Sequence, residues 1–225
     1  ADGVTNNAAA IQQAIDEASA AGGRVVIPQG KYLSGTLVLK SNIDFHLEKG
    51  AVLISSLNQE DIMDFAKLFE DDNACTGWDG GCFLFACHEE NITISGEGVI
   101  YGQGDKVFID DDVDGGAHEC PLSVAAFRPR TTFLEDVTNL TVRDITIQDA
   151  AFWTLHMAGC HHVRVQDIKI LNDVRGANND GIDPDCCKDV LITGCLVKTG
   201  DDAIVIKTTK PMTQRYGASE NIVIS

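Results

Sequence analysis

Short apolar strands, each introduced by a polar residue, recur along this chain. The repeated units occupy residues 91–94, 139–142, 162–165, 189–192 and 221–224. The step between matching positions is 23 residues from Leu140 to Val163, 27 from Val163 to Val190 and 32 from Val190 to Ile222. Further β-branched alternation follows at 145–147, 168–170 and 204–206. Strands separated by Gly, Asn and Asp in this way are typical of β structure punctuated by turns.

Two architectures accommodate such a pattern. An antiparallel sandwich would space its strands irregularly, whereas a parallel β-helix stacks each coil on the last, so that equivalent residues recur once per coil. Whole units align here, and the differences in step length fall in turns. We expect the extra residues 208–218 to form one such loop. We therefore predict an all-β chain folded as a parallel β-helix, forming a single domain over residues 1–225.

A helix is predicted at the start of the chain. Asn6 and Asn7 precede apolar residues at i, i+4 and i+8 spacing, and glycines follow at 22–23. Asparagine is a good N-cap, and glycine commonly ends a helix. An open β-helix end exposes apolar core and unpaired strand edge, so we expect this helix to cover that end. The first strands are predicted at 24–28 and 36–40.

Two stretches, near 56–88 and 101–130, lack any periodicity. Irregular segments of this length in a compact domain tend to be functional, so we expect these insertions to project as walls beside the coils. The second insertion contains the acidic run 110–114. That run lacks the spacing of a calcium-binding EF-hand loop and is better explained as a solvated acidic loop.

Charge excludes several classes of partner. The chain has 34 acidic and 17 basic residues, a formal net charge of −17, and is 44% hydrophobic. Nucleic acids and anionic membranes require a basic surface, so neither is an expected partner. No apolar run approaches the roughly 18 residues of a membrane span. The chain can bury a sizeable core, and we expect a monomer.

The eight cysteines permit disulfides without requiring them. Cys75, Cys82 and Cys87 lie in the first insertion and are candidates for bridging. The cysteines among strand-like segments could equally be buried thiols, which behave as small apolar residues; they are Cys160, Cys186, Cys187 and Cys195. The C-x₂-C spacing typical of zinc sites is absent, so no metal site is predicted.

Three aspartates form the strongest candidate site. Trp153 precedes Asp180 by 27 residues, the same step as Val163 to Val190. Asp180-Gly181-Ile182 also matches Asp202-Ala203-Ile204 as the entry to a strand. We therefore expect Asp180 and Asp202 on adjacent coils, about 4.8 Å apart at the backbone, with Asp201 beside them. Glycoside hydrolysis needs such a set, with an acid for the leaving oxygen and a base for water.

Asp-Asp-Gly and Asn-Asp-Gly clusters also serve simply as turns, so a structural role is the alternative. Strict alternation would bury Asp202 with Ile204, where an unpaired carboxylate is costly. We therefore place these aspartates in the turn before the strand. An inverting reaction would further require about 6.5–9.5 Å between the acid and base carboxyls, and we predict a gap of that order.

At these residues the chain resembles glycoside hydrolase family 28, the polygalacturonase family. Asn178-Asn179-Asp180-Gly181 resembles its N-T-D-G motif, and Gly200-Asp201-Asp202-Ala203 its G-D-D motif. Segments 10–16, 26–30, 46–51 and 152–156 are also similar to that family. The resemblance implies a right-handed β-helix and metal-free, inverting cleavage of galacturonan or rhamnogalacturonan in pectin. It makes Asp201 the general acid, while Asp180 and Asp202 activate water.

Two departures accompany the resemblance. Asn179 stands where the family usually has Thr. A Gly-His-Gly motif and an Arg-x-Lys that grips the substrate carboxylate are missing. The chain is therefore expected to be truncated at its C-terminus, or to belong to a divergent branch.

Four residues are assigned to substrate binding: Asn178, Trp153, His156 and Lys207. Lys207 shares the parity of Asp201 along its strand and could meet an anionic sugar, although a solvated lysine is the alternative. Trp153 and His156 lie one coil before Asp180, where an aromatic face could support a sugar ring or form a buried wall.

Three functions suit this pattern. The first is hydrolysis of a pectic polysaccharide or oligogalacturonide by a secreted or periplasmic enzyme without a cofactor. The second is a polysaccharide lyase, which would need calcium on clustered carboxylates and an Arg or Lys base. The third is a non-catalytic glycan-binding β-helix. Hydrolysis is favoured because the three aspartates are grouped and no basic residue adjoins them within the visible strands.

Overall fold

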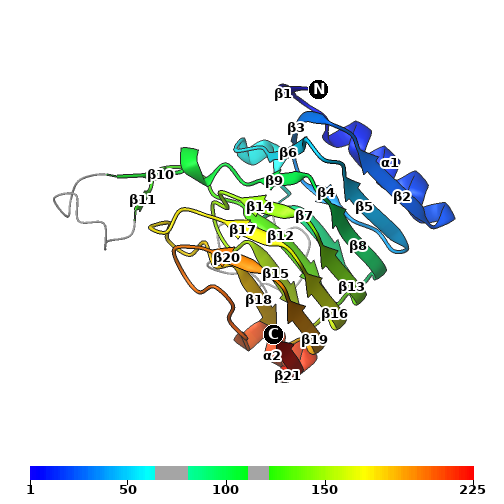
Figure 1. The fold of residues 1–225 in the computed structure, drawn as a ribbon, viewed down its shortest axis with the longest axis vertical. Helices are drawn as coiled ribbons and strands as arrows, with labels where there is room; N and C mark the ends of the chain where they lie inside the picture. Colours follow the sequence, from blue (N-terminus) through cyan, green and yellow to red (C-terminus); the bar gives the residue numbers. More distant parts are fainter. Residues whose placement is uncertain (64–80, 111–121) are drawn as a thin grey trace.

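The computed structural model describes residues 1–63, 81–110 and 122–225. Within them the chain winds into a β-helix of three parallel sheets (Figure 1). Leu140 pairs with Val163, Val163 with Val190, and Val190 with Ile222, all in parallel. The predicted alignment of coils is therefore confirmed. Consecutive parallel connections of this kind are right-handed in nearly all proteins.

The first sheet is the one that the N-terminal strand joins. In spatial order its strands are β1 (Asp2–Asn6), β3 (Gly30–Ser34), β6 (Ala51–Ser55), β9 (Val99–Tyr101), β14 (Thr146–Gln148), β17 (Lys169–Leu171) and β20 (Leu196–Lys198).

The second sheet contains the repeats that were recognised in the sequence. Its strands are β2 (Gly23–Ile27), β5 (Ile43–Leu47), β8 (Glu90–Gly96), β13 (Thr138–Arg143), β16 (His161–Gln166), β19 (Lys188–Thr193) and β21 (Glu220–Ile224).

The third sheet positions the candidate site. Its strands are β4 (Leu37–Val38), β7 (Cys82–Cys87), β12 (Arg130–Glu135), β15 (Leu155–Ala158) and β18 (Ile182–Asp185). Residues 82–87 were expected in a projecting wall, and this part of the prediction is wrong. Every residue of β7 except Cys87 is buried, because both faces of the sheet are covered. Period-2 alternation is therefore absent from its sequence.

Part of the second insertion forms a small antiparallel pair, β10 (Phe108–Ile109) and β11 (Ser123–Val124). It extends away from the coils in Figure 1. Two 3₁₀ turns, η1 (Gln59–Asp61) and η3 (Gly104–Lys106), lie in the insertions. Residues 64–80 and 111–121 of the insertions, which include Cys75 and most of the acidic run, lie outside the described residues.

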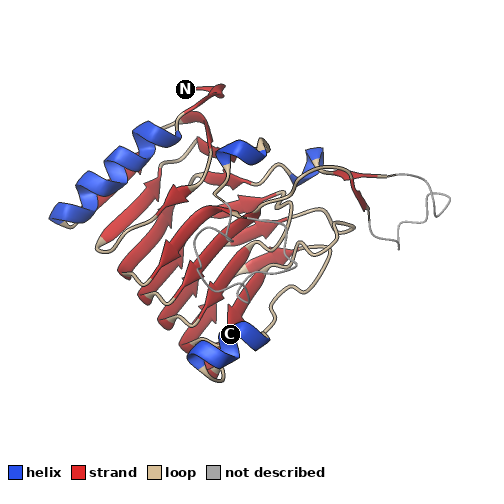
Figure 2. Ribbon diagram, turned by 180° about the vertical axis from the view of Figure 1, so that it is seen from behind, coloured by secondary structure: helices blue, strands red, loops and turns tan. Residues whose placement is uncertain are grey.

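The predicted N-terminal helix is confirmed as α1 (Ala8–Ala21), which packs across one end of the coils (Figure 2). Ile11 and Ile15 are its buried residues, and Gly22 ends it with φ +69°. The side chain of Asn7 does not cap the helix. Asn6 Oδ1 instead accepts the Ala8 N–H at 2.9 Å.

A second helix, α2 (Lys210–Tyr216), replaces the loop expected within 208–218. Met212 is buried, and Tyr216 packs with it against residues of the third sheet that include Phe133 and Phe85. At seven residues it is too short to be stable alone, so these tertiary contacts stabilise it.

Apolar side chains from all three sheets fill the inside of the coils. Cys160 and Cys187 are among them, as small buried residues. These two, with Cys87, Cys186 and Cys195, are thiols and not disulfides. No helix in the described part of the chain is long and apolar enough to cross a membrane.

Candidate active site

Asp180 and Asp202 lie side by side on neighbouring coils. The Gly181 N–H donates to the Asp202 carbonyl at 2.8 Å, and Ile182 bridges Ile204 in parallel. The structure thus brings together the two positions that were matched as equivalent strand entries. Asp201 and Asp202 are exposed, and only Asp180 is buried. Asp202 therefore lies in the turn, as predicted, and avoids the apolar interior.

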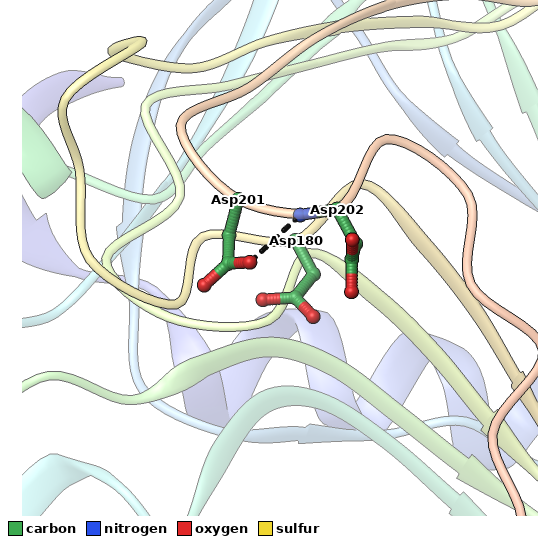
Figure 3. A group of neighbouring side chains, drawn as sticks. All are labelled: Asp180, Asp201 and Asp202. Atoms are coloured by element: carbon green, nitrogen blue, oxygen red, sulfur yellow. Dashed lines mark hydrogen bonds between the residues drawn. The ribbon is translucent and has the colours of Figure 1, made fainter. Parts of the chain in front are cut away.

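The three carboxylates point into one small region (Figure 3). One oxygen from each lies within 4.8 Å of the others, and the Asp202 N–H donates to Asp201 Oδ1 at 3.0 Å. These oxygens are closer together than the gap of about 6.5–9.5 Å that was predicted between the acid and base carboxyls. The spacing is short because adjacent coils are only about 4.8 Å apart.

Lys207 is the cation of this cluster. Its Nζ lies 2.9 Å from Asp180 Oδ2 and 3.6 Å from Asp183 Oδ1, and 4.1 Å from the centre of the Trp153 ring. Burial alone would lower the pKa of Lys207, but the charges of Asp183 and Asp180 raise it. The side chain is only 14% exposed. Lys207 therefore acts as a counter-ion inside the protein, and its predicted contact with a sugar carboxylate is not what the structure favours.

Burial dominates the pKa of Asp180 and raises it, while the hydrogen bond and charge of Lys207 lower it and the charge of Asp201 raises it. Asp180 Oδ1 is buried and has no hydrogen-bond partner among the described residues. One carboxylate oxygen is thus held by Lys207, and the other is available.

Asp183 is a site residue that sequence reasoning missed. It lies on β18, three residues after Asp180, and is fully buried. Burial raises its pKa to about 8, against the opposing charge of Lys207. The available signal was the Asp183-Pro184-Asp185 run within a strand, since period-2 alternation points both aspartates to the outer face.

Trp153 and His156 are wall residues and not an open sugar platform. They are 6% and 4% exposed, and their rings meet edge-on with centroids 4.8 Å apart. Trp153 also stacks on Phe152. His156 Nε2 lies 3.4 Å from Asp185 Oδ2, and burial lowers the pKa of His156 to about 4. The outer face of the third sheet is covered here, so these two side chains are buried and do not form the open aromatic platform that the sequence left as one possibility.

Asn178 and Asn179 have different positions. Asn178 is exposed, and its Oδ1 accepts from Arg128 Nη2 at 3.2 Å. Asn179 is fully buried, with Oδ1 accepting the Gly200 N–H and Nδ2 donating to the Asp173 carbonyl, both at 2.8 Å. Asn179 therefore ties together the turns that carry Asp180 and Asp201. Its motif position was noted from the sequence, but this positioning role was not predicted.

Two arginines from the second insertion lie beside the site. Arg128 lies 4.4 Å from the Phe152 ring centre, and Arg130 lies 5.1 Å from that of Trp153. Arg128 also donates to the Ala177 carbonyl at 2.8 Å. Together with Lys207, these residues concentrate positive charge near the aspartates of an otherwise acidic chain. Neither arginine was predicted from the sequence to supply this charge.

Comparisons with known proteins identify the family. The family model "Glycosyl hydrolases family 28" matches residues 20–218. The chain belongs to this family. A relative named "Probable polygalacturonase" from Vitis vinifera is 28% identical over 217 residues, which cover 92% of this chain and 42% of the relative. The chain thus spans less than half the length of the curated relatives that it matches most strongly.

Solved structures show the same architecture. A hyperthermoactive exopolygalacturonase from Thermotoga maritima superposes with a TM-score of 0.77 at 26% identity, covering 98% of this chain and 55% of that one. A putative glycosyl hydrolase from Parabacteroides merdae gives a TM-score of 0.72 at 27% identity, covering 99% and 88%. The predicted right-handed parallel β-helix and the predicted family are both confirmed.

Proposed function

We propose that this chain contains the acid/base centre of a glycoside hydrolase that cleaves galacturonan-type pectic polysaccharide or oligosaccharide. The observation that carries the proposal is the convergence of Asp180, Asp201 and Asp202 from two adjacent coils. Asp201 donates a proton to the leaving glycosidic oxygen. Asp180 and Asp202 accept a proton from the attacking water, whose oxygen bonds to the anomeric carbon as the glycosidic bond breaks.

The contacts of the aspartates support this division of roles. A hydrogen-bonded ammonium favours the ionised form of a carboxyl, and Lys207 gives one to Asp180. An ionised carboxylate suits a base. Asp201 receives no such cation among the described contacts and is exposed to solvent, where a sugar can approach it.

The positive side chains around the site support an acidic substrate. Pectic galacturonan is a polyanion, and the chain itself has a net charge of −17. Long-range repulsion is screened beyond about 10 Å at 0.1 M salt, so nearby cations decide binding. Arg128 is the candidate for that contact, because it is partly exposed and lies against the Asn178 turn.

Inversion is proposed from the family resemblance alone. The oxygens within 4.8 Å of one another give it no support, since inverting sites usually separate their carboxyls by about 6.5–9.5 Å. The stereochemistry is therefore measured separately from the activity.

The test is digestion of polygalacturonate, followed by new reducing ends and by NMR of the first-formed anomer. We expect reducing ends, an inverted first anomer and full activity in the presence of a chelator. Retention of configuration would contradict inversion while leaving hydrolysis in place.

Two outcomes would favour the rivals. An ultraviolet-absorbing unsaturated product that disappears with chelator would identify a lyase, for which the same three carboxylates form a group able to hold a metal ion. Binding of the polymer without new reducing ends would identify a non-catalytic glycan-binding protein.

The proposed substrate also bears on where the protein works. Pectic polymers lie outside the cell, so we propose a secreted or periplasmic protein that acts as a monomer. Neither nucleic acid nor a membrane is a proposed partner, because the chain lacks the basic balance that either requires. Size-exclusion chromatography with light scattering tests the monomer.

A further inference from the structure

Two buried carboxyls share one cation beside the candidate site. Asp180 and Asp183 are 3% and 0% exposed, and Lys207 Nζ lies between them at 2.9 and 3.6 Å. The shorter contact is a hydrogen bond, whereas the longer one exceeds hydrogen-bond length. Neither oxygen of Asp183 has a hydrogen-bond partner among the described residues.

Among the described residues, the charged groups that act most strongly on Asp183 are Lys207, Asp180 and Asp202, of which Lys207 is the cation. Arg130 is a further cation nearby, but it lies against the rings of Phe152 and Trp153, 5.0 and 5.1 Å from their centres. On the neighbouring strand β15, the residue in register is His156, which is buried and neutral above a pKa of about 4. Two ionised carboxylates next to a single ammonium would leave a buried net negative charge. Proteins avoid that cost by keeping a proton on one of the groups.

We propose that Asp183 is a positioning residue that stays protonated and so leaves the Lys207 ammonium to Asp180, which keeps Asp180 ionised as a base. The proposal rests on the function proposed above for Asp180. Geometry decides which carboxyl holds the proton, since Lys207 donates to Asp180 and not to Asp183. The raised pKa of Asp183, about 8, agrees with this assignment.

A consequence follows in alkaline solution. Once Asp183 loses its proton, its carboxylate attracts the same ammonium, which is only 3.6 Å away. Asp180 then shares the Lys207 ammonium with the ionised carboxylate of Asp183, which is fully buried. The pH–rate profile should therefore contain an ionisation near pH 8 that lowers the hydrolytic rate and belongs to Asp183, in addition to those of the groups that touch substrate.

The test is the pH–rate profile of Asp183→Asn in the full-length protein. Asn has nearly the shape of Asp but cannot ionise, so Lys207 stays with Asp180 at every pH. We expect the ionisation near pH 8 to disappear from the alkaline limb, so that the lower end of the limb extends to higher pH. The matched control is Asp185→Asn. Asp185 lies on the same strand and is equally buried, but it accepts a hydrogen bond from Thr209 Oγ1 at 2.6 Å. It should leave the position of that limb unchanged. An unmoved limb in Asp183→Asn overturns the proposal.

A second measurement does not depend on catalysis. In ¹³C-aspartate NMR, one carboxyl should remain protonated at pH 6, titrate near pH 8, and be missing from the spectrum of Asp183→Asn. If Asp183→Asn does not fold, Lys207→Met serves instead, because losing the ammonium should give two protonated carboxyls at pH 6 in place of one. Absence of any such carboxyl overturns the proposal. Its presence in a protein that releases no reducing ends supports the charge state of Asp183 and overturns the proposed function of the site.

Discussion

The second and third sheets bury their strands differently. In β13, β16 and β19 of the second sheet, buried residues alternate with residues that are partly or fully exposed. In β12, β15 and β18 of the third sheet, every residue is buried. The second sheet thus has one face in solvent, whereas the third sheet is covered on both faces, in part by α2.

This difference changes what a polar residue on the outer face requires. On the second sheet such a residue is solvated and needs no partner. On the third sheet it is buried and must be paired, since an unpaired polar group costs about 1–3 kcal/mol. Glu135 and Asp185 satisfy that rule through several hydrogen bonds. Neither carboxylate oxygen of Asp183 has a hydrogen-bond partner among the described residues, and Asp183 adjoins the candidate site.

The largest effect expected from this comparison is on activity. Asp201→Asn removes the proposed proton donor with little change in shape, so kcat should fall by ~10²–10⁴-fold while binding is retained. The matched control is Asp144→Asn, which changes an exposed aspartate in a turn after β13 that pairs with its neighbour Arg143. Steady-state kinetics of reducing-end release measure both. Equal losses of kcat in the two variants would show that the turn that carries Asp201, at the edge of the third sheet, is not where the reaction takes place.

The next effect is on stability and compares similar ion pairs on the two sheets. Glu135 on the third sheet accepts from Arg215 at 2.9 Å and is 1% exposed. Glu135→Ala should lower the free energy of unfolding by about 3 kcal/mol, because breaking a buried pair leaves a charge without compensation. On the second sheet, Asp44 pairs with the half-exposed Arg24 at 2.7 Å. Asp44→Ala should cost less than about 1 kcal/mol. Urea unfolding of both variants measures the difference, and equal costs would contradict it.

The same contrast explains what could be predicted from the sequence. The second sheet was read correctly because its solvated face preserves polar residues between apolar ones, so strands, register and coil steps are visible. β7 was missed because Cys82–Cys87 is continuously apolar, as expected where both faces are covered. α2 was missed because its seven residues depend on contacts of Met212 and Tyr216 with the third sheet, which no local pattern reveals.

The site divides in the same way. Asp180 and Asp202 were predicted from coil register and motif, both of which are local or periodic properties. The burial of Trp153 and His156 depends on what covers the third sheet, so sequence reasoning left an open platform as one possibility. Lys207 was a candidate from the sequence and lies beside Asp180, but its second partner Asp183 was missed, because pairing between residues 24 positions apart depends on a tertiary contact.

A third prediction concerns how stability depends on pH through two buried residues of the third sheet, Asp183 and His156. The pKa of Asp183 rises from 3.8 to about 8 on folding, so its contribution to stability is lost as pH rises between those values. The pKa of His156 falls from 6.5 to about 4, so its contribution is lost as pH falls between those values. From about pH 4 to 6.5, Asp183 lowers the stability as pH rises while His156 raises it. Above pH 6.5 only the effect of Asp183 remains of these two.

The parent protein should therefore lose about 2 kcal/mol more than Asp183→Asn between pH 6.5 and 8, at about 1.36 kcal/mol per pH unit. Urea midpoints at the two pH values measure this. The control is Asp189→Asn on the second sheet, whose side chain is half-exposed and which should keep the parent's pH dependence. A parent whose stability does not differ between pH 6.5 and 8 would contradict the prediction.

The smallest effect concerns the turns that enter the second sheet. Each coil begins there with a polar residue in the left-handed region, and at Asn139 φ is +60°. Asn139 Nδ2 also donates to Asn91 Oδ1 of the preceding coil at 2.9 Å. Asn139→Ala loses that bond and takes on a strained backbone, for about 1–2 kcal/mol. Asn139→Gly loses the same bond without the strain, so it should cost clearly less than Asn139→Ala. Urea unfolding of the two variants side by side separates the contributions, because the bond is absent from both. A glycine variant no more stable than the alanine variant would mean that backbone strain does not explain the asparagine at position 139.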